Sequence, residues 1–227
     1  MWGCTVPSDL LRQTEQLKSH LAGMGEHADA CVAAALDVLE SGDARAATQV
    51  IADDADRDRA YAHIQNGVLA AIALHHPVGA ELRTLTGVLH AGLHVERMID
   101  LGVSMARTVE PAVDDQGDAD VVHQLLEMGG FAREVASRSV QAFLEDADHV
   151  AEEAERLDDA VDRLYASIFG RLVRLAGSDE RLLSWATRMI HLTRQFERYA
   201  DHGVDVAEQA AFVRTGEPVR LRRASTA

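Results

Sequence analysis

The amino-acid sequence predicts an all-α protein, organised as two tandem three-helix bundles with six helices in all. Apolar residues make up 47% of the 227 residues and aromatic residues only 4%, a balance that suits close helix packing better than a β-sandwich. The four prolines lie far apart and leave long stretches without a helix breaker. Charged positions of the first half recur in the second half, which indicates an internal duplication.

The first half of the chain is expected to contain three long helices. Apolar residues over 10–38 recur at steps of three, four and seven positions, which is the stripe of a helix that packs on other helices. Asp43 follows the glycine that ends this segment and can cap the next helix, expected over about 44–75. Pro77 stops the second helix, and the third is expected to run to about Val109.

The stretch 110–118 is the best candidate for a linker between the two halves. It contains Pro111, Gly117 and four acidic residues, with little that is apolar. The sequence therefore predicts a first repeat over 1–112 and a second over 113–227, which ends in a short basic tail. Three further helices are expected over about 119–144, 148–176 and 179–213, the last with Ser178 or Asp179 as its N-cap.

The net charge indicates which partners the protein can bind, and the sequence also bears on its location in the cell. The formal net charge is −15 and the pI is near 5.0, whereas binding to nucleic acid through its phosphates needs a basic face. The amino terminus shows no signal-peptide pattern, and no run of about 18 uncharged apolar residues occurs. Cys4 and Cys31 are too few for a disulfide framework or a thiolate metal site. We therefore expect a cytoplasmic protein without a nucleic-acid partner.

The internal duplication is clearest at charged positions. Residues 96–102, Glu-Arg-Met-Ile-Asp-Leu-Gly, recur 101 residues later as 197–203, Glu-Arg-Tyr-Ala-Asp-His-Gly. The acidic stretch 54–58 recurs 104 residues later as 158–162. A duplicated helical unit explains both matches.

Each repeat therefore carries two pairs of carboxylates spaced four residues apart. At this spacing both side chains leave one face of a helix, and the pairs border the apolar stripe. Like charges so placed cost a helix about 0.2–0.5 kcal/mol per pair, a cost that a bound cation would reverse. Oxygen ligands favour hard or borderline ions such as Mg²⁺, Mn²⁺ or iron. The candidate metal ligands are Asp54, Asp58, Glu96, Asp100, Asp158, Asp162, Glu197 and Asp201.

Three histidines lie in or near the acidic motifs of the third helix of each repeat. His202 follows Asp201 directly and is either a metal ligand or a polar residue on an exposed helix face. His90 and His191 are repeat equivalents with apolar neighbours, and we expect them to be interior and hydrogen-bonded.

Two other classes of protein also fit acidic helices of this kind. One is a carboxylate-bridged metalloenzyme of the helical-bundle type, whose ferritin-like members use a Glu-x-x-His motif from each of two helices. No Glu in this sequence is followed three residues later by His, which argues against an oxidase but not against metal-dependent hydrolysis. The other is a metal-free acidic scaffold that docks basic partners.

The chain resembles the PhoU family of phosphate-signalling proteins over nearly its whole length. Repeats of that family carry an acidic motif, Glu/Asp-x-x-x-Asp, in the second helix and a Glu-Arg-x-x-Asp motif in the third. This sequence offers 54–58 and 158–162 for the first motif, and 96–100 and 197–201 for the second. Four motifs in order at the expected offsets make the resemblance specific.

The resemblance implies a six-helix protein of two bundles without an established catalytic activity, and we expect no enzyme. It implies a cytoplasmic negative regulator of phosphate uptake and phosphate-starvation signalling that acts by protein contact. The expected partners are the ATPase subunit of a phosphate transporter, a phosphate sensor histidine kinase, or both, so any membrane association is peripheral and runs through them. Some members of that family bind multinuclear metal clusters at the acidic motifs and others are metal-free. The resemblance therefore leads us to expect metal ions (Fe, Mn, Mg or Zn) at these motifs, and it is compatible with a homodimer.

The first repeat departs from the family pattern. Its helix seam holds Asp53 and Arg57 where the second repeat holds Leu157 and Val161. Arg57 also places a positive charge beside Asp58. Because that charge competes with a cation, the second repeat is expected to hold the better metal site.

Overall fold

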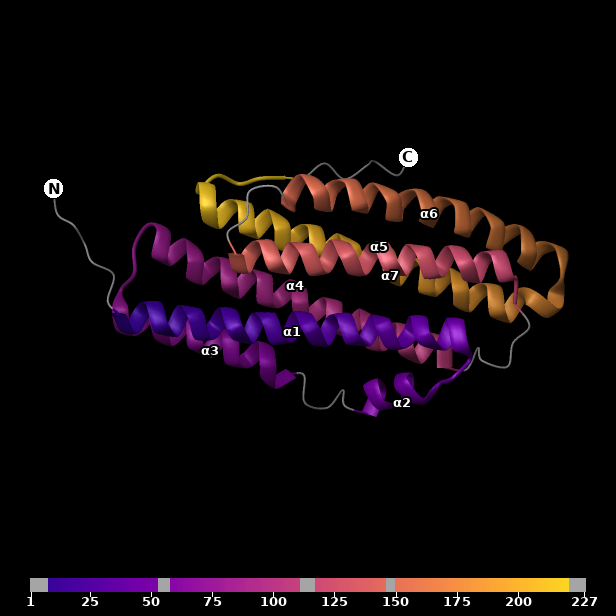
Figure 1. Cartoon of the computed structure of the whole chain (residues 1–227), viewed down its shortest axis with the longest axis horizontal. Coiled ribbons are helices and arrows are strands. Elements are labelled where there is room, and N and C mark those ends of the chain that lie inside the picture. Colours follow the sequence, from indigo (N-terminus) through magenta and orange to yellow (C-terminus); the bar gives the residue numbers. More distant parts are fainter. Residues whose placement is uncertain (1–7, 53–57, 111–116, 146–149, 221–227) are drawn as a thin grey trace.

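The computed structural model describes residues 8–52, 58–110, 117–145 and 150–220, and within these ranges it contains helices and no strand. The long helices lie side by side along one axis (Figure 1). No helix in these ranges combines the length and the apolar character that a membrane crossing requires. In chain order the elements are α1 (Ser8–Ser41), α2 (Arg45–Ala52), α3 (Asp58–His75), α4 (Ala80–Val109), α5 (Ala119–Glu145), α6 (Val150–Ser178), the short 3₁₀-helix η3 (Glu180–Leu182) and α7 (Leu183–Thr215).

Aspartate and glycine residues set several of the helix ends. Oδ1 of Asp43 accepts a hydrogen bond from the backbone N–H of Arg45 at 3.0 Å, and Oδ1 of Asp179 accepts one from Arg181 at the same distance. Both are contacts that an N-cap makes, and the capping role expected for Asp43 is confirmed. Asp179 caps η3 and not the long helix α7, whose N-cap is Leu182 without a side-chain hydrogen bond. Gly216 ends α7 with a φ of 78°, a left-handed conformation that glycine adopts without a Cβ clash.

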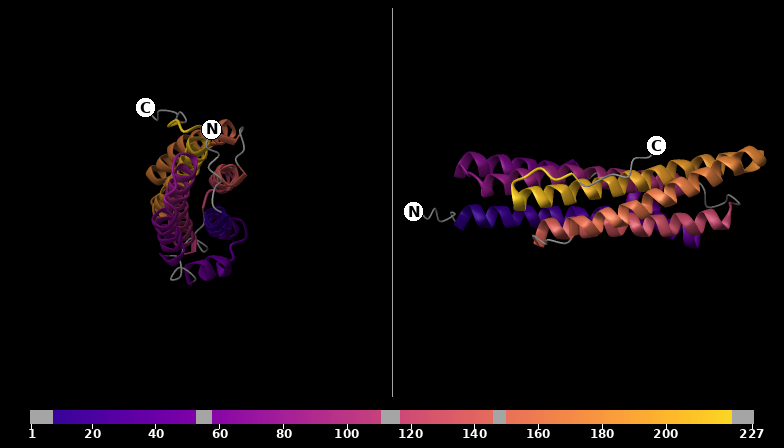
Figure 2. Two further views of the ribbon diagram at one scale, coloured as in Figure 1. Left: turned by 90° about the vertical axis from the view of Figure 1, so that its left-hand side faces the viewer. Right: turned by 90° about the horizontal axis from the view of Figure 1, so that it is seen from above.

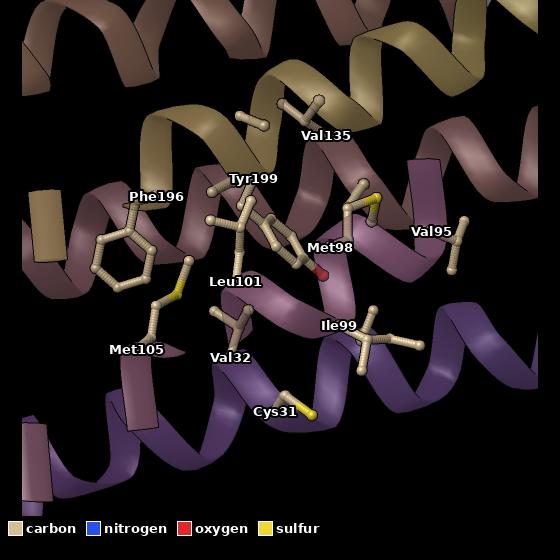
Figure 3. Packing of buried hydrophobic residues seen from close by; sticks show 14 of the residues in the cluster. Cys31, Val32, Val95, Met98, Ile99, Leu101, Met105, Val135, Phe196 and Tyr199 are labelled. Atoms are coloured by element: carbon tan, nitrogen blue, oxygen red, sulfur yellow. The ribbon is translucent and has the colours of Figure 1, made fainter. Parts of the chain in front are cut away.

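The two repeats join along a shared apolar core. Helices α1, α3 and α4 pack together in the first repeat and α5, α6 and α7 in the second, while α4 lies against α7 and α1 against α5. The views of Figure 2 show the same elongated bundle from its end and from above. Figure 3 shows side chains of both repeats interleaved in one cluster, among them the fully buried Met105 of α4 and Phe196 of α7. The interface between the repeats is therefore continuous with the core of each.

The all-α prediction is confirmed, and one element differs. The second helix, expected as a single element over 44–75, is found as α2 and α3, so the described residues contain seven α-helices and not six. Residues 53–57 and 111–116 lie outside the described ranges, and the predicted division between 112 and 113 stays a prediction.

The prediction that His90 and His191 are interior is wrong, because both side chains are exposed. A neighbour in sequence lies about 100° around a helix, so a residue beside buried positions need not itself face the core. Val88 and Leu192, which lie close by on the same two helices, are the residues that point inward.

A glycine repeated in both halves allows the first and third helices of each repeat to approach closely. A Cβ added at Gly102 of α4 would come within 2.6 Å of the Cβ of Cys31 on α1. A Cβ added at Gly203 of α7 would come within 3.1 Å of the Cα of Ala136 on α5. The last residue of the repeated seven-residue motif is therefore a packing residue, because only hydrogen fits there.

We expect Gly102→Ala to lower the free energy of unfolding by about 1–3 kcal/mol, because the added methyl group overpacks the α1–α4 contact. Urea unfolding followed by circular dichroism measures this change. Gly130→Ala on α5 is the control, since nothing lies within 4 Å of its Cβ position and the residue is exposed. The control should gain about 0.5–1 kcal/mol from helix propensity. Equal effects of the two substitutions would contradict the close approach.

Candidate metal centre

The acidic motifs of the second repeat meet where α6 and α7 pack together. Asp158 and Asp162 extend from α6, and Glu197 and Asp201 extend from α7. Asp158 is only 6% exposed and the other three are partly buried. We call these four residues the α6–α7 carboxylate centre.

The carboxylates of the two helices influence one another across the α6–α7 interface. Burial raises the pKa of Asp162, and the charges of Asp201 and Asp159 raise it further. Burial likewise raises the pKa of Glu197, the charge of Asp201 adds to this effect, and Arg194 opposes it. Asp162 also contributes to the raised pKa of Glu197. The charged forms are thus disfavoured in the folded protein, and a divalent cation between the helices would relieve that repulsion.

Glu197 carries a second sign of a ligand in this centre. Its Oε2 atom is buried and has no hydrogen-bond partner in the part of the chain that the structure describes. A buried carboxylate oxygen normally has a donor or a cation to offset the loss of water. The unpartnered oxygen, the raised pKa values and the all-oxygen donor set together fit a hard divalent cation in this centre.

The carboxylate centre is more open than the coordination shell of one ion. Among the described residues, the group of three ligand atoms that all lie within 4.8 Å of one another belongs to His94, His202 and Asp205, and not to the four carboxylates. The four carboxylates lie on two helices that pack against each other, and their role as metal ligands stays a prediction. Coordination by three of them would require their side chains to turn inward.

The acidic residues of α4 in the first repeat share one feature with those of α7 and differ in another. Oε2 of Glu96 is also buried without a hydrogen-bond partner among the described residues, but an arginine lies close to it. On α4, Nη1 of Arg97 lies 3.3 Å from Oδ2 of Asp100, and Nε of the same arginine lies 3.7 Å from Oε2 of Glu96. A guanidinium that pairs with both carboxylates competes with a cation for them. Asp54 lies outside the described residues, as does the side chain of Asp58, so their metal-binding role stays a prediction.

The sequence predicts His202 as a candidate ligand but gives no such indication for His94 or Asp205. Asp205 lies three residues after His202 and so shares its helix face, and this spacing is the one signal in the sequence that connects the two residues. His94 lies on α4 in the other repeat, and no pattern in the sequence connects it to α7. Only the packing of α4 against α7 brings the three side chains together.

Two helical repeats with acidic pairs at equivalent positions define a class of protein built by duplication of one bundle. The family model described as the PhoU domain matches this chain twice, over residues 21–109 and 125–210. The chain therefore belongs to the PhoU family, and the predicted resemblance is confirmed.

Individual relatives agree with this assignment over most of their length. The chain is 28% identical to a phosphate-specific transport system accessory protein PhoU homolog of Clostridium acetobutylicum, over 91% of this chain and 94% of the relative. It is 32% identical to the homolog of the same name from Deinococcus radiodurans, over 72% of this chain and 76% of the relative. These relatives are named as accessory proteins and not as enzymes, in agreement with the expectation for this chain.

Solved structures show the same fold. The crystal structure of PhoU from Pseudomonas aeruginosa superposes with a TM-score of 0.85 at 22% identity, over 91% of this chain and 99% of the other. The phosphate transport system regulatory protein PhoU from Streptococcus pneumoniae gives a TM-score of 0.85 at 22% identity, over 93% and 100%. The helical, twice-repeated architecture is therefore that of the family.

Proposed function

We propose that this protein is an accessory regulator of phosphate uptake and phosphate-starvation signalling that works by protein contact in the cytoplasm. The observation that carries the proposal is the match of both repeats to a family whose members are named as accessory proteins of the phosphate-specific transport system. Regulation by contact means that the protein binds one conformational state of its partner more tightly than the other. The difference between the two binding free energies shifts the partner towards the favoured state.

The chemistry of the surface favours a basic partner. The chain carries a formal net charge of −15, and α6 and α7, which bear the acidic motifs of the second repeat, lie along the long axis of the molecule (Figure 1). Complementary charge steers association, and its effect falls as salt screens it. The ATPase subunit of a phosphate transporter or a sensor histidine kinase is the proposed partner, and any contact with the membrane runs through it.

A cation in the α6–α7 carboxylate centre is part of the proposal. Burial and mutual repulsion disfavour the charged forms of Asp162 and Glu197, so a bound ion would stabilise the packing of α6 on α7. Mg²⁺, Mn²⁺ and Fe²⁺ suit the oxygen ligands best, while Zn²⁺ prefers nitrogen or sulfur.

Deletion of the gene tests the regulatory role. We expect alkaline phosphatase, or an equivalent reporter of phosphate starvation, to rise under high phosphate in the deletion strain, and a plasmid copy of the wild-type gene to restore repression. An Asp162→Asn/Glu197→Gln copy should repress less well than wild type, whereas Glu127→Gln, an exposed change on α5, should repress fully. Unchanged reporter output after deletion, in a strain without a paralogue, would refute the proposal.

A further inference from the structure

We propose that His94, His202 and Asp205 form a second metal site, which holds a borderline first-row divalent cation such as Zn²⁺ between the two repeats. His94 belongs to α4, whereas His202 and Asp205 lie one turn apart on α7. This trio shares no residue with the α6–α7 carboxylate centre. The inference therefore goes beyond the proposed function and does not depend on it.

The three ligand atoms of the trio form a nearly equilateral triangle. Nδ1 of His94 lies 3.2 Å from Nδ1 of His202 and 3.3 Å from Oδ2 of Asp205, and Nδ1 of His202 lies 3.6 Å from the same oxygen. A tetrahedral ion with ligands at about 2.0–2.1 Å separates neighbouring ligand atoms by about 3.3–3.4 Å. An octahedral ion at the same bond lengths separates them by only about 2.9 Å. The triangle therefore fits a four-coordinate ion better than a six-coordinate one.

The donor set of the trio favours a borderline metal over a hard one. Two imidazole nitrogens with one carboxylate oxygen suit zinc and its first-row neighbours, whereas Mg²⁺ prefers oxygen alone. Two neutral imidazoles whose Nδ1 atoms face each other can place only one hydrogen between them. A cation instead accepts both lone pairs, and it is also attracted by the charge of Asp205.

The orientation and exposure of the rings agree with a site that solvent can reach. The side chains of His94, His202 and Asp205 are 24%, 22% and 20% exposed, so a water molecule could complete the fourth position. The two imidazole rings are tilted by 46° with centroids 5.5 Å apart, as rings aimed at a common point would be. The His20–His63 pair is different, because its rings stack at 4.1 Å with an angle of 19°.

Because the chain is duplicated, each residue of the trio has an equivalent position in the other repeat, and none of these positions holds a residue of the metal-binding type. The equivalent positions in the other repeat, 101 residues away, hold Gln195, Leu101 and Ser104. There Nε2 of Gln195 donates a hydrogen bond to Oγ of Ser104 at 2.5 Å, a neutral contact across the same pair of helices. The fold thus tolerates neutral side chains at the three equivalent positions. Helix packing therefore does not by itself explain why the trio consists of ionisable residues that can bind a metal.

Titration of the chelator-treated full chain with Zn²⁺, followed by calorimetry, tests the site. Each variant takes the residue from the equivalent position, as His94→Gln, His202→Leu or Asp205→Ser, so that the fold is retained, which circular dichroism confirms. We expect each to lower the Zn²⁺ affinity of this site by about 100-fold or more, since even an outer-shell change costs 10–100-fold. His63→Gln, in the stacked pair, should leave the affinity unchanged. Co²⁺ in place of Zn²⁺ should give the intense visible bands of a tetrahedral ion in the wild type and lose them in His202→Leu.

The outcomes separate this site from the carboxylate centre. The Asp162→Asn/Glu197→Gln variant should keep its tight zinc, and the trio variants should keep any response to Mg²⁺ or Mn²⁺. The proposal is overturned if the wild type binds no Zn²⁺ at micromolar concentrations, or if the trio variants bind it as tightly as the wild type. It is equally overturned if zinc binding disappears in Asp162→Asn/Glu197→Gln, because the metal would then lie between α6 and α7.

Discussion

Replacement of Phe196 by alanine is expected to lower the free energy of unfolding by about 3–5 kcal/mol. The ring is fully buried on α7, in the core that the two repeats share (Figure 3). It also packs on α5, since a Cβ added at Gly129 would come within 3.0 Å of its Cε1 atom. Removal of the ring loses its transfer free energy and leaves a cavity at the junction of the repeats. Because domains are stable by only about 5–15 kcal/mol, urea unfolding should show a large shift in the midpoint.

The same substitution at Phe169 is the matched control. Phe169 lies on α6, is 42% exposed and stacks on Tyr165. Its replacement by alanine should cost about 1 kcal/mol or less, because much of the ring already contacts water. A small loss in Phe196→Ala, similar to that in Phe169→Ala, would mean that the repeats do not share a packed core.

A hard divalent cation is expected to stabilise the wild-type protein by about 2.7 kcal/mol when its free concentration is 100 times the dissociation constant. For a chain of this length that corresponds to a rise of about 5–10 °C in the thermal midpoint. The Asp162→Asn/Glu197→Gln variant should lose this response. Its metal-free form should be slightly more stable than wild type, by a few tenths of a kcal/mol for each repulsive pair removed. The sign follows from the raised pKa of both carboxyl groups, because folding disfavours their charged forms.

Scanning calorimetry of chelator-treated protein, with and without Mn²⁺ or Mg²⁺, measures both effects. Glu127→Gln removes one negative charge on α5 outside the centre and should respond like wild type. No midpoint shift in the wild type would leave the protein as a metal-free acidic scaffold. A shift that persists in Asp162→Asn/Glu197→Gln would place the cation elsewhere.

The sequence by itself determined the features that depend on local spacing. Apolar residues at helical steps predicted the long helices, and Asp43 and Asp179 marked helix starts because an N-cap needs only its own next few residues. The recurrence of 96–102 as 197–203 revealed the duplication and also placed Glu197 beside the helix seam. These inferences succeeded because each rests on contacts within one helix or on a comparison of the chain with itself.

The tertiary structure decided everything that depends on which helices meet. His90 and His191 have apolar neighbours in sequence, but the packing of their helices leaves both exposed. Glu197 lies near the carboxylate of Asp162 because α6 packs against α7. His94 joins His202 and Asp205 because α4 of one repeat lies against α7 of the other, a contact between residues more than 100 positions apart. A helical period fixes the face on which a side chain lies, and only the packing of helices fixes what that face meets.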